Sequence, residues 1–597
     1  MNTKEKLRAL RQAMQQANID AYLVPSTDPH MSEYVAPRWQ GRSWLSGFTG
    51  SAGTLIVTHN WAGLWTDSRY FIQAERELED SGIELMKLRV AHTPEYKNWL
   101  IDNLKPGQSL GYAGNCLSIS AARDIDGKMA KNGIHTDATQ DLLEDVWPDR
   151  PKSPQNPIYP QPDQYVDRSA TEKIDQLRVW MEKKGLDYYL VGALDHQAWL
   201  LNVRGSDIDY NPLVVAYLGV PLKGNLEWFV GPGRLPAQWA NALDLNAYPY
   251  KAAAGRLIEL QSQGIQIGLD PSTTNLAIYE AAGGPAAREL SSPVPGWKSI
   301  KNAEATAHIR NAMARDGLAL LRLRRWLDTE AAKGKSEYEV VRQLTAYRSA
   351  LPNYIGDSFG AIVGWKGNGA IVHYDPPQSA SASIDGRGML LVDSGGQYLD
   401  GTTDITRTFC LGEPTETEKR HFTLVLQGMI DLTLARFPAG TSGVQLDTLA
   451  RQHLWRESLN FGHGTGHGVG YFLNVHEGPA SISSNPRAKS GQHPLQAGMI
   501  FSNEPGYYLE GQYGIRCENL VQVVATSPGW LAFDTLTIFP FERKLIALDM
   551  LSHQQLQWLN DYHQQVWEAM KGLVEGDERS WLEAACQPVH TKTEQLI

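Results

Sequence analysis

Histidines gather in the segment GHGTGHGVGYFLNVHEGP, residues 462–479. His463 and His467 are four residues apart, which on a helix is a spacing that holds a zinc ion. The alternating glycines argue against a helix, because each one costs about 1 kcal/mol in a helix interior. The alternation instead predicts an extended chain, in which residues four apart are separated by about 13 Å. We therefore expect at most one of the two histidines to bind a given ion, with the other ligands coming from elsewhere.

Four acids lie on two expected hairpins. In LLVDSGGQYLDGTTDITRTF, Asp393 ends an apolar strand and Asp404 lies on the threonine-rich strand that follows. In MIFSNEPGYYLEGQYGIRCENLVQVV, Glu504 ends an apolar strand and Glu518 lies on the next one, across a loop that contains glycine. The same arrangement occurs twice, with aspartates in the first hairpin and glutamates in the second.

Four carboxylates that meet in a protein interior need a counter-charge, because buried like charges repel one another. Two divalent cations would neutralise the four acids and leave His467 as a neutral nitrogen ligand. Two such ions lower the pKa of a bridging water towards ~7, which predicts hydrolytic chemistry. An oxygen-rich set of ligands with one imidazole suits Mn²⁺, with Zn²⁺ and Co²⁺ as alternatives.

Each of these residues also has a simpler interpretation when it is taken alone. An aspartate such as Asp393 more often ends a strand or a turn than binds a metal, and a single histidine such as His467 is as often packed in the core. Arg516 stands two residues before Glu518 on the same expected face of a strand. It is either a surface ion pair or a residue that holds a metal-binding carboxylate. The occurrence of all five candidate ligands together favours the metal site.

Composition limits the class of protein to which the chain belongs. Its 597 residues suffice for three or four domains, and 42% hydrophobic with 20% charged residues is ordinary for globular protein. The formal net charge of −11 is spread without basic runs, which argues against a nucleic-acid partner. No stretch reaches ~18 consecutive apolar residues, so no membrane span is expected. Four distant cysteines without C-x-x-C spacing predict reduced thiols in a cytoplasmic protein.

The N-terminal half contains an internal repeat. The segment LRQAMQQANIDAYLVPSTD from Leu10 aligns without a gap with LRVWMEKKGLDYYLVGALD from Leu177. Each copy predicts an amphipathic helix followed by a buried strand, which indicates a duplicated α/β domain. Proline-rich segments at 147–164 and 283–297 are expected to be linkers.

The C-terminal half begins with expected helices at 303–334 and 336–348. Strands and glycine-containing turns are then expected to dominate to about residue 545. The tail from Ser552 has apolar residues at helical spacing, which is typical of a docking or oligomer surface.

Several ordered motifs resemble those of the pita-bread metallopeptidases, and among these the three-domain Xaa-Pro aminopeptidases. In the C-terminal half the matching motifs are GNGAIVHYDPP, LLVDSGGQYLDGTTDITRTF, GHGTGHGVGYFLNVHEGP, FSNEPGYY and GIRCENL, and near the N-terminus they are YLVPSTDPHMSEYVAPRW and GFTGSAGTLIVT. The resemblance implies an α/β (α+β) protein in four segments. These are two creatinase-like N-terminal domains at 1–158 and 165–297, a pita-bread catalytic domain at 298–545 and a helical extension at 546–597.

The resemblance also assigns roles to individual residues. It implies that the metal ligands are Asp393, Asp404, His467, Glu504 and Glu518. Glu504 would also be the general base. Three further histidines would bind substrate and stabilise the transition state, namely His373, His463 and His476. One departure from the family pattern, Tyr471 in place of a smaller residue, is expected to narrow the cleft.

The activity that the resemblance implies is hydrolysis of the N-terminal Xaa-Pro bond of short peptides, by a hydroxide that bridges two divalent metals, most suitably Mn²⁺. The implied partners are peptides with proline at the second position, and the implied oligomer is a homodimer. Prolidase, which cleaves Xaa-Pro dipeptides with the same metals, is the nearest alternative. A non-catalytic pita-bread binding module is a more distant one, because such a module has lost its metal ligands.

Overall fold

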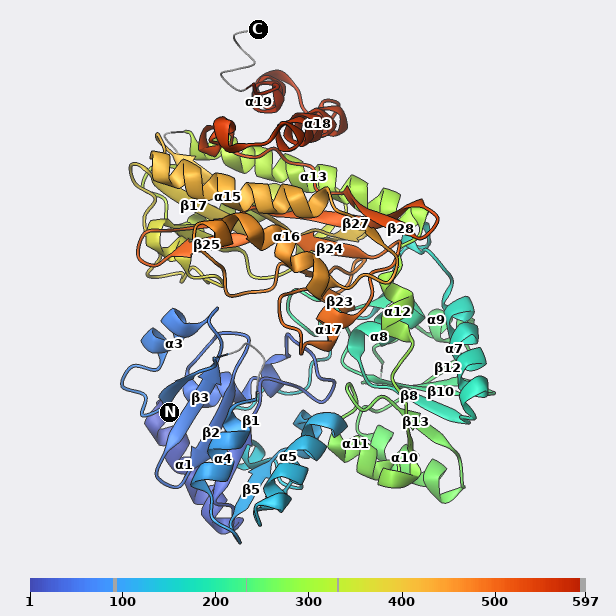
Figure 1. Ribbon diagram of the computed structural model, residues 1–597. Helices are drawn as coiled ribbons and strands as arrows, with labels where there is room; N and C mark the ends of the chain where they lie inside the picture. The colour runs from blue at the N-terminus through green and yellow to red at the C-terminus, as the bar shows by residue number, and fades with distance from the viewer. Residues whose placement is uncertain (90–93, 232, 330–331, 591–597) are drawn as a thin grey trace. The chain divides into compact units, whose positions relative to one another are not determined.

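The computed structural model describes residues 1–89, 94–231, 233–329 and 332–590 (Figure 1). Two compact units make up the chain, and each combines two separate segments. The first unit is Met1–Gln161 with Arg168–Val294, and the second is Pro162–Asp167 with Pro295–Ile597. No helix among the described residues is long and apolar enough to cross a membrane. The division of the chain into the four segments 1–158, 165–297, 298–545 and 546–597 stays a prediction.

The first unit begins with the expected helix and buried strand. A capping box between Asn2 and Glu5 starts helix α1 (Thr3–Gln16), because both side chains satisfy free backbone N–H groups. Strand β1 (Ala21–Val24) is buried on both faces, with α1 packed on one face and α5 on the other. The strands of this sheet, in the order β4-β3-β2-β1-β5-β6, are Glu84–Lys87, Ala62–Thr66, Thr54–Thr58, Ala21–Val24, Ser109–Tyr112 and His135–Asp137. Its remaining helices are α2 (Gly41–Ser46), α3 (Phe71–Glu77), α4 (Tyr96–Asn103), α5 (Ile119–Lys131) and α6 (Leu142–Val146).

A second sheet in this unit repeats the first. Its strands, in the order β12-β11-β10-β8-β13-β14, are Leu245–Tyr248, Leu226–Phe229, Tyr217–Pro221, Tyr188–Val191, Ile267–Leu269 and Arg288–Glu289. In both sheets the first and the last two neighbouring pairs are parallel, and the other two pairs are antiparallel. The helices that accompany the second sheet are α7 (Ala170–Lys184), α8 (Leu194–Leu201), α9 (Ala237–Ala242), α10 (Ala252–Ser262) and α11 (Leu276–Ala281). Helix α12 (Val294–Ser299) begins at the last residue of the first unit and continues into the second. The shared topology confirms the duplication read from the sequence.

The proline-rich segments are more ordered than linkers. In the first, β7 (Tyr159–Pro160) pairs with β9 (Val203–Arg204). In the second, the edge strand β14 pairs with β13, so the interpretation of 283–297 as a linker is wrong for its centre. The prolines of this segment lie outside β14, which leaves the backbone N–H groups of that strand free to pair.

The helices of the second unit include two that the sequence analysis missed. The expected ones are α13 (Ala303–Leu327), α14 (Glu337–Ser349) and α18 (His553–Met570), and α19 (Gly576–Cys586) follows. Within the region expected to be mostly strands lie α15 (Glu416–Thr433) and α16 (Gly443–Arg456), so that expectation was wrong there. These two helices contact each other, and α15 also contacts β24 and β28 (Figure 1). Short α17 is Lys489–Gln492.

Four sheets build the rest of the second unit. A three-stranded sheet orders β16 (Ile362–Trp365), β17 (Gly388–Ser394) and β20 (Ile405–Leu411). A six-stranded sheet orders β21 (Arg436–Pro438), β28 (Trp530–Thr535), β27 (Asn519–Ser527), β24 (Ile500–Asn503), β22 (Gly466–Gly468) and β23 (Glu477–Ile482). The small sheets are β15 (Tyr354–Asp357) with β18 (Gly396–Tyr398) and β19 (Gly401–Thr402), and β25 (Gly506–Leu509) with β26 (Tyr513–Arg516).

The two expected hairpins have the same plan. Strands β17 and β20 pair antiparallel, and β18 and β19 are inserted between them. Strands β24 and β27 also pair antiparallel, with the β25–β26 hairpin inserted. The four acids lie where the long strands give way to these insertions.

Candidate active site

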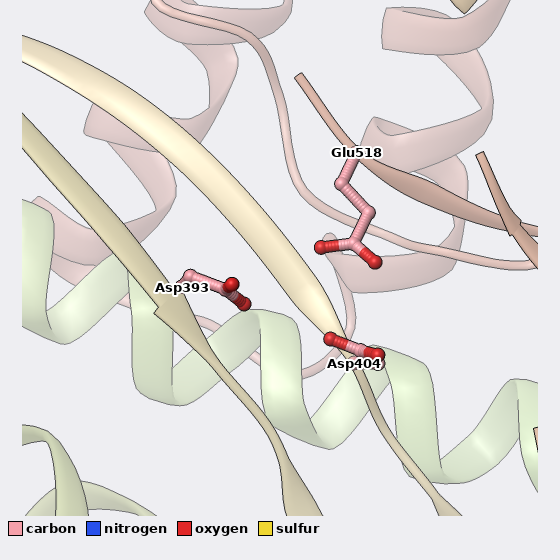
Figure 2. A group of neighbouring side chains, drawn as sticks. All are labelled: Asp393, Asp404 and Glu518. Atoms are coloured by element: carbon pink, nitrogen blue, oxygen red, sulfur yellow. The ribbon is translucent and has the colours of Figure 1, made fainter. Parts of the chain in front are cut away.

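Three carboxylates converge from the two hairpins. Asp393 lies near the end of β17, Asp404 directly precedes β20, and Glu518 directly precedes β27. One oxygen of each lies within 4.8 Å of the others, and all three residues are buried. Figure 2 shows their carboxyl groups facing a common space. Asp393 lies opposite Thr406 in the β17–β20 ladder. Because successive side chains of a strand point to opposite faces, this register decides which side chains face the common space.

His467 and Glu504 complete the cluster. His467 Nε2 lies 3.4 Å from Asp404 Oδ2 and 3.4 Å from Glu504 Oε1. The backbone N–H of His467 donates to Ser502 Oγ at 3.0 Å, and that hydroxyl donates to Glu504 Oε1 at 3.0 Å. The structure therefore brings all five candidate ligands together. Asp393 and His467 lie in β17 and β22, whereas Asp404, Glu504 and Glu518 lie directly beside the ends of β20, β24 and β27.

The glycines around His467 permit close backbone approach. His467 lies in strand β22, which confirms the extended chain and excludes the zinc-helix geometry. A Cβ added at Gly466 would lie 1.9 Å from the carbonyl oxygen of Ser502, and one added at Gly468 would lie 2.2 Å from that of Glu477. Glycine is required here because the neighbouring backbones leave no room for a side chain.

Burial, with repulsion from neighbouring acids, raises the pKa of Asp393, Glu504 and Glu518. Burial raises the pKa of Glu504 to about 7, with the charge of His467 opposing the change. Burial also raises the pKa of Glu518 well above its usual range, and the charges of Asp404 and Glu504 add to this. Burial alone would lower the pKa of His467, but the hydrogen bond to Asp404 and the charge of Glu504 raise it to about 9. A bound cation would stabilise the ionised form of these acids.

The donor atoms fit divalent metal ions. Asp393 Oδ1 and Glu518 Oε1 are buried and have no hydrogen-bond partner among the described residues. Their other oxygens are held, because Arg516 Nη2 donates to Asp393 Oδ2 and Thr406 Oγ1 donates to Glu518 Oε2. His467 Nδ1 donates to the carbonyl of Gly468 at 2.9 Å, which leaves Nε2 as an acceptor. Four carboxylates with one oriented imidazole are a suitable set of ligands for two such ions.

Arg516 joins the candidate ligands to residues around them. It is buried at the end of β26, and its Nε donates to Thr406 Oγ1 at 3.0 Å. The structure therefore favours the interpretation that Arg516 holds a carboxylate over that of a surface ion pair. Glu518 lies outside the strand that carries Arg516, so the expectation that the two share a strand face was wrong.

A chain of hydrogen bonds runs from His463 to Asp393. His463 Nδ1 donates to the carbonyl of Gly464 at 2.7 Å, and Tyr508 OH donates to His463 Nε2 at 2.8 Å. Arg516 Nη1 donates to Tyr508 OH at 2.7 Å and Nη2 donates to Asp393. Sequence reasoning missed Tyr508, although it lies in the quoted motif FSNEPGYY.

The other two histidines occupy different surroundings. His476 lies next to His467, with ring centroids 4.3 Å apart and ring planes at 85°. His373 is half-buried in the turn after the short helix η6 (Lys366–Ala370). That helix contacts β17, which carries Asp393, and β26, which ends at Arg516. Tyr471, expected to narrow the cleft, is buried.

Comparison with known protein families covers most of the chain. Residues 307–525 match the model of metallopeptidase family M24, and residues 529–589 match that of the C-terminal region of peptidase M24. Residues 6–145 and 149–305 each match a model of the creatinase/prolidase N-terminal domain.

Individual relatives extend over the full length. A probable Xaa-Pro aminopeptidase P from Neosartorya fischeri is 40% identical over 616 residues, which cover 99% of this chain and 93% of the relative. One from Laccaria bicolor is 40% identical over 608 residues, which cover 99% and 94%. The crystal structure of X-prolyl aminopeptidase from Caenorhabditis elegans, described as a cytosolic enzyme with a di-nuclear active site, is 33% identical. It has a TM-score of 0.93 and covers 99% of this chain and 100% of its own. The chain therefore belongs to the Xaa-Pro aminopeptidase P family of the M24 metallopeptidases.

Proposed function

We propose that this protein is a metal-dependent aminopeptidase that hydrolyses the N-terminal Xaa-Pro bond of short peptides. The observation that carries the proposal is the convergence of Asp393, Asp404, His467, Glu504 and Glu518 on one buried space. The relatives named Xaa-Pro aminopeptidase P support the choice of bond, because they match this chain from end to end.

Two divalent metal ions per subunit are the proposed cofactors, with Mn²⁺ preferred over Zn²⁺ and Co²⁺. The proposed ligands are the five residues of the cluster, which supply oxygen atoms and one imidazole nitrogen. When bound, two such ions would polarise the scissile carbonyl and lower the pKa of the attacking water. The di-nuclear site described for the Caenorhabditis elegans enzyme supports the number of ions.

The residues around the cluster have proposed roles in proton transfer and substrate binding. Glu504, whose Oε1 is fixed by Ser502, would accept a proton from the attacking water. His463 Nε2 lies 2.8 Å from the hydroxyl of Tyr508, and His463 would line the substrate cleft together with His373 and His476. These histidines would hold the oxygen on which negative charge develops. Proline at the second position of the substrate has no N–H, so it must be recognised by the shape of its ring.

A peptidase assay with metal analysis tests this function. Purified protein with Mn²⁺ should release the first residue of Xaa-Pro-Xaa tripeptides and leave Xaa-Ala-Xaa tripeptides intact. Asp404→Ala should abolish cleavage and lower the metal content, whereas Glu510→Ala, at an exposed position of the β25–β26 turn, should change neither. Equal cleavage of the alanine peptide would contradict the proline specificity. Cleavage of Xaa-Pro dipeptides alone would indicate a prolidase, and absence of both metal and cleavage a binding module.

The cellular location and the oligomeric state of the enzyme are also proposed. All four cysteines are buried and free, which is typical of a reducing compartment and supports a cytoplasmic location. The Caenorhabditis elegans enzyme is described as cytosolic. We further propose a homodimer and the four segments with boundaries at 158, 165, 297 and 545, which chromatographic mass determination and limited proteolysis would test.

A further inference from the structure

Glu337 is a fully buried carboxylate outside the metal cluster. It is the first residue of α14, and its side chain is 0% exposed. Glutamate is almost never fully buried unless its charge is satisfied by partners. The N-terminus of a helix favours a negative charge, which contributes part of that compensation.

The other groups that compensate the buried charge of Glu337 belong to one segment of chain, residues 365–382. Glu337 Oε1 accepts from the backbone N–H of Trp365 at 2.7 Å and from Asn368 Nδ2 at 3.0 Å. Oε2 accepts from Tyr374 OH at 2.7 Å and from the backbone N–H of Ala382 at 3.0 Å. The carboxylate thus binds the beginning, the middle and the end of the segment.

Backbone contacts fasten the same segment to the start of α14. The N–H of Glu337 donates to the carbonyl of Ala382 at 3.0 Å, and the N–H of Ile384 donates to that of Lys335 at 2.8 Å. Between these bonds, Ser336 and Ser383 form an isolated β-bridge. The segment is therefore a closed loop with Glu337 at its base.

The loop carries His373, directly before Tyr374. We propose that Glu337 is a positioning residue for His373, which it holds through Tyr374 and Asn368 so that the imidazole can bind the substrate. This role rests on the proposed function, because it assigns His373 to the substrate. Among the described residues, no hydrogen bond joins Glu337 to a candidate metal ligand.

The geometry requires a carboxylate rather than an amide. Each oxygen of Glu337 accepts from a backbone N–H, that of Trp365 on one side and that of Ala382 on the other. Glutamine has one NH₂ group, which must face one of these donors whichever way the amide is turned. One buried N–H then loses its acceptor, and the loop is expected to shift.

The test compares Glu337→Gln with Glu339→Gln, which alters an exposed glutamate of the same helix and keeps its capping box. We expect Glu337→Gln to lower kcat/KM for an Xaa-Pro-Xaa peptide by roughly 10- to 100-fold, because a misplacement of about 1 Å can cost 10²-fold. Its Mn²⁺ content should stay at the wild-type value. Glu339→Gln should be unchanged in both.

A double-mutant cycle with His373→Ala separates positioning from a general loss of structure. If Glu337 acts through His373, the double variant should be no slower than His373→Ala alone, within about twofold. The proposal would be overturned if the losses of kcat/KM in the two single variants multiply in the double variant. It would also be overturned if Glu337→Gln is as active as Glu339→Gln. Should Glu337→Gln fail to fold, Tyr374→Phe removes one donor to the carboxylate and should reduce kcat/KM in the same non-additive way.

A measurement without substrate keeps this proposal distinct from the proposed function. Hydrogen exchange of residues 366–382 should be faster in Glu337→Gln than in wild type, and unchanged in Glu339→Gln. This outcome is expected even if the wild-type protein cleaves no Xaa-Pro peptide, in which case the proposed function alone fails. Unchanged exchange in Glu337→Gln would overturn the inference that this residue holds the loop.

Discussion

Glu477 lies between two buried lysines, and its replacement tests the charge balance beside the site. It follows His476 and begins β23. Lys298 Nζ donates to Glu477 Oε1 at 2.8 Å, and Lys301 Nζ donates to Oε2. All three side chains are at most 3% exposed. Burial lowers the pKa of Lys301, and the charges of Glu477 and Asp167 oppose this effect.

The expected loss of folding free energy in Glu477→Gln follows from the two lysines that lose their charged partner. Two buried ammonium groups would face an uncharged amide, and removing one partner of a buried ion pair costs about 3–5 kcal/mol. Lys301→Met removes only one of the two cations and leaves Lys298 paired, so its cost should be about 1.5–3 kcal/mol, that of a hydrogen bond to a charged group. Glu477→Gln should therefore be the more destabilising of the two changes.

Differential scanning calorimetry of the metal-free protein measures this order. At about 2 °C per kcal/mol for a large domain, Glu477→Gln should lower the Tm of the transition of the second unit by about 6–10 °C. Glu416→Gln is the matched control, because Glu416 pairs with Lys419 at the surface and such a pair contributes only about 0–1 kcal/mol. A Tm for Glu477→Gln equal to that of the control, or above that of Lys301→Met, would refute the reasoning.

Three further predictions concern the metal cluster and its surroundings. Adding Mn²⁺ to metal-free protein at pH 7.5 should release about one to two protons, because the pKa of His467 is about 9, that of Glu504 is about 7, and burial raises that of Glu518 well above its usual range. Metal affinity should therefore rise with pH, and calorimetry that finds no proton release in two buffers would contradict this. Gly466→Ala should abolish metal binding, since its Cβ would lie 1.9 Å from a carbonyl oxygen, whereas Gly572→Ala, whose Cβ meets nothing within 4 Å, should bind metal normally in the same metal analysis. Arg516→Lys should lower kcat/KM by about 10- to 100-fold, because one ammonium cannot replace a guanidinium that reaches several acceptors; wild-type kinetics would show that those contacts are unimportant.

The sequence was most informative where pattern and chemistry coincide. The alternating glycines around His467 predicted an extended chain approached by other backbones, and β22 has that structure. The repeated segments from Leu10 and Leu177 predicted two similar domains, which have the same strand order. Both patterns can be recognised within short stretches of sequence, so they do not depend on knowing the tertiary fold.

Other features depend on contacts between distant segments and could not be read in advance. Thr406 and Ser502 orient Glu518 and Glu504, yet an isolated hydroxyl residue in a strand gives no sign of its partner. The β25–β26 insertion places Glu518 outside the strand of Arg516, a change of register that sequence spacing does not reveal. Helices α15 and α16 were missed for a different reason. The glycines around them are typical of turns, whereas the capping box between Thr415 and Glu418 and the helical spacing of apolar residues predict α15.

The central claim is that four acids from two hairpins, together with His467 from strand β22, hold two divalent cations. Anomalous diffraction at the manganese absorption edge, from crystals grown with Mn²⁺, tests it most directly. We expect two peaks about 3.5–4 Å apart, each within bonding distance of side chains among Asp393, Asp404, His467, Glu504 and Glu518. Crystals whose anomalous map shows no ion between these side chains, in protein that still cleaves Xaa-Pro peptides, would contradict the claim.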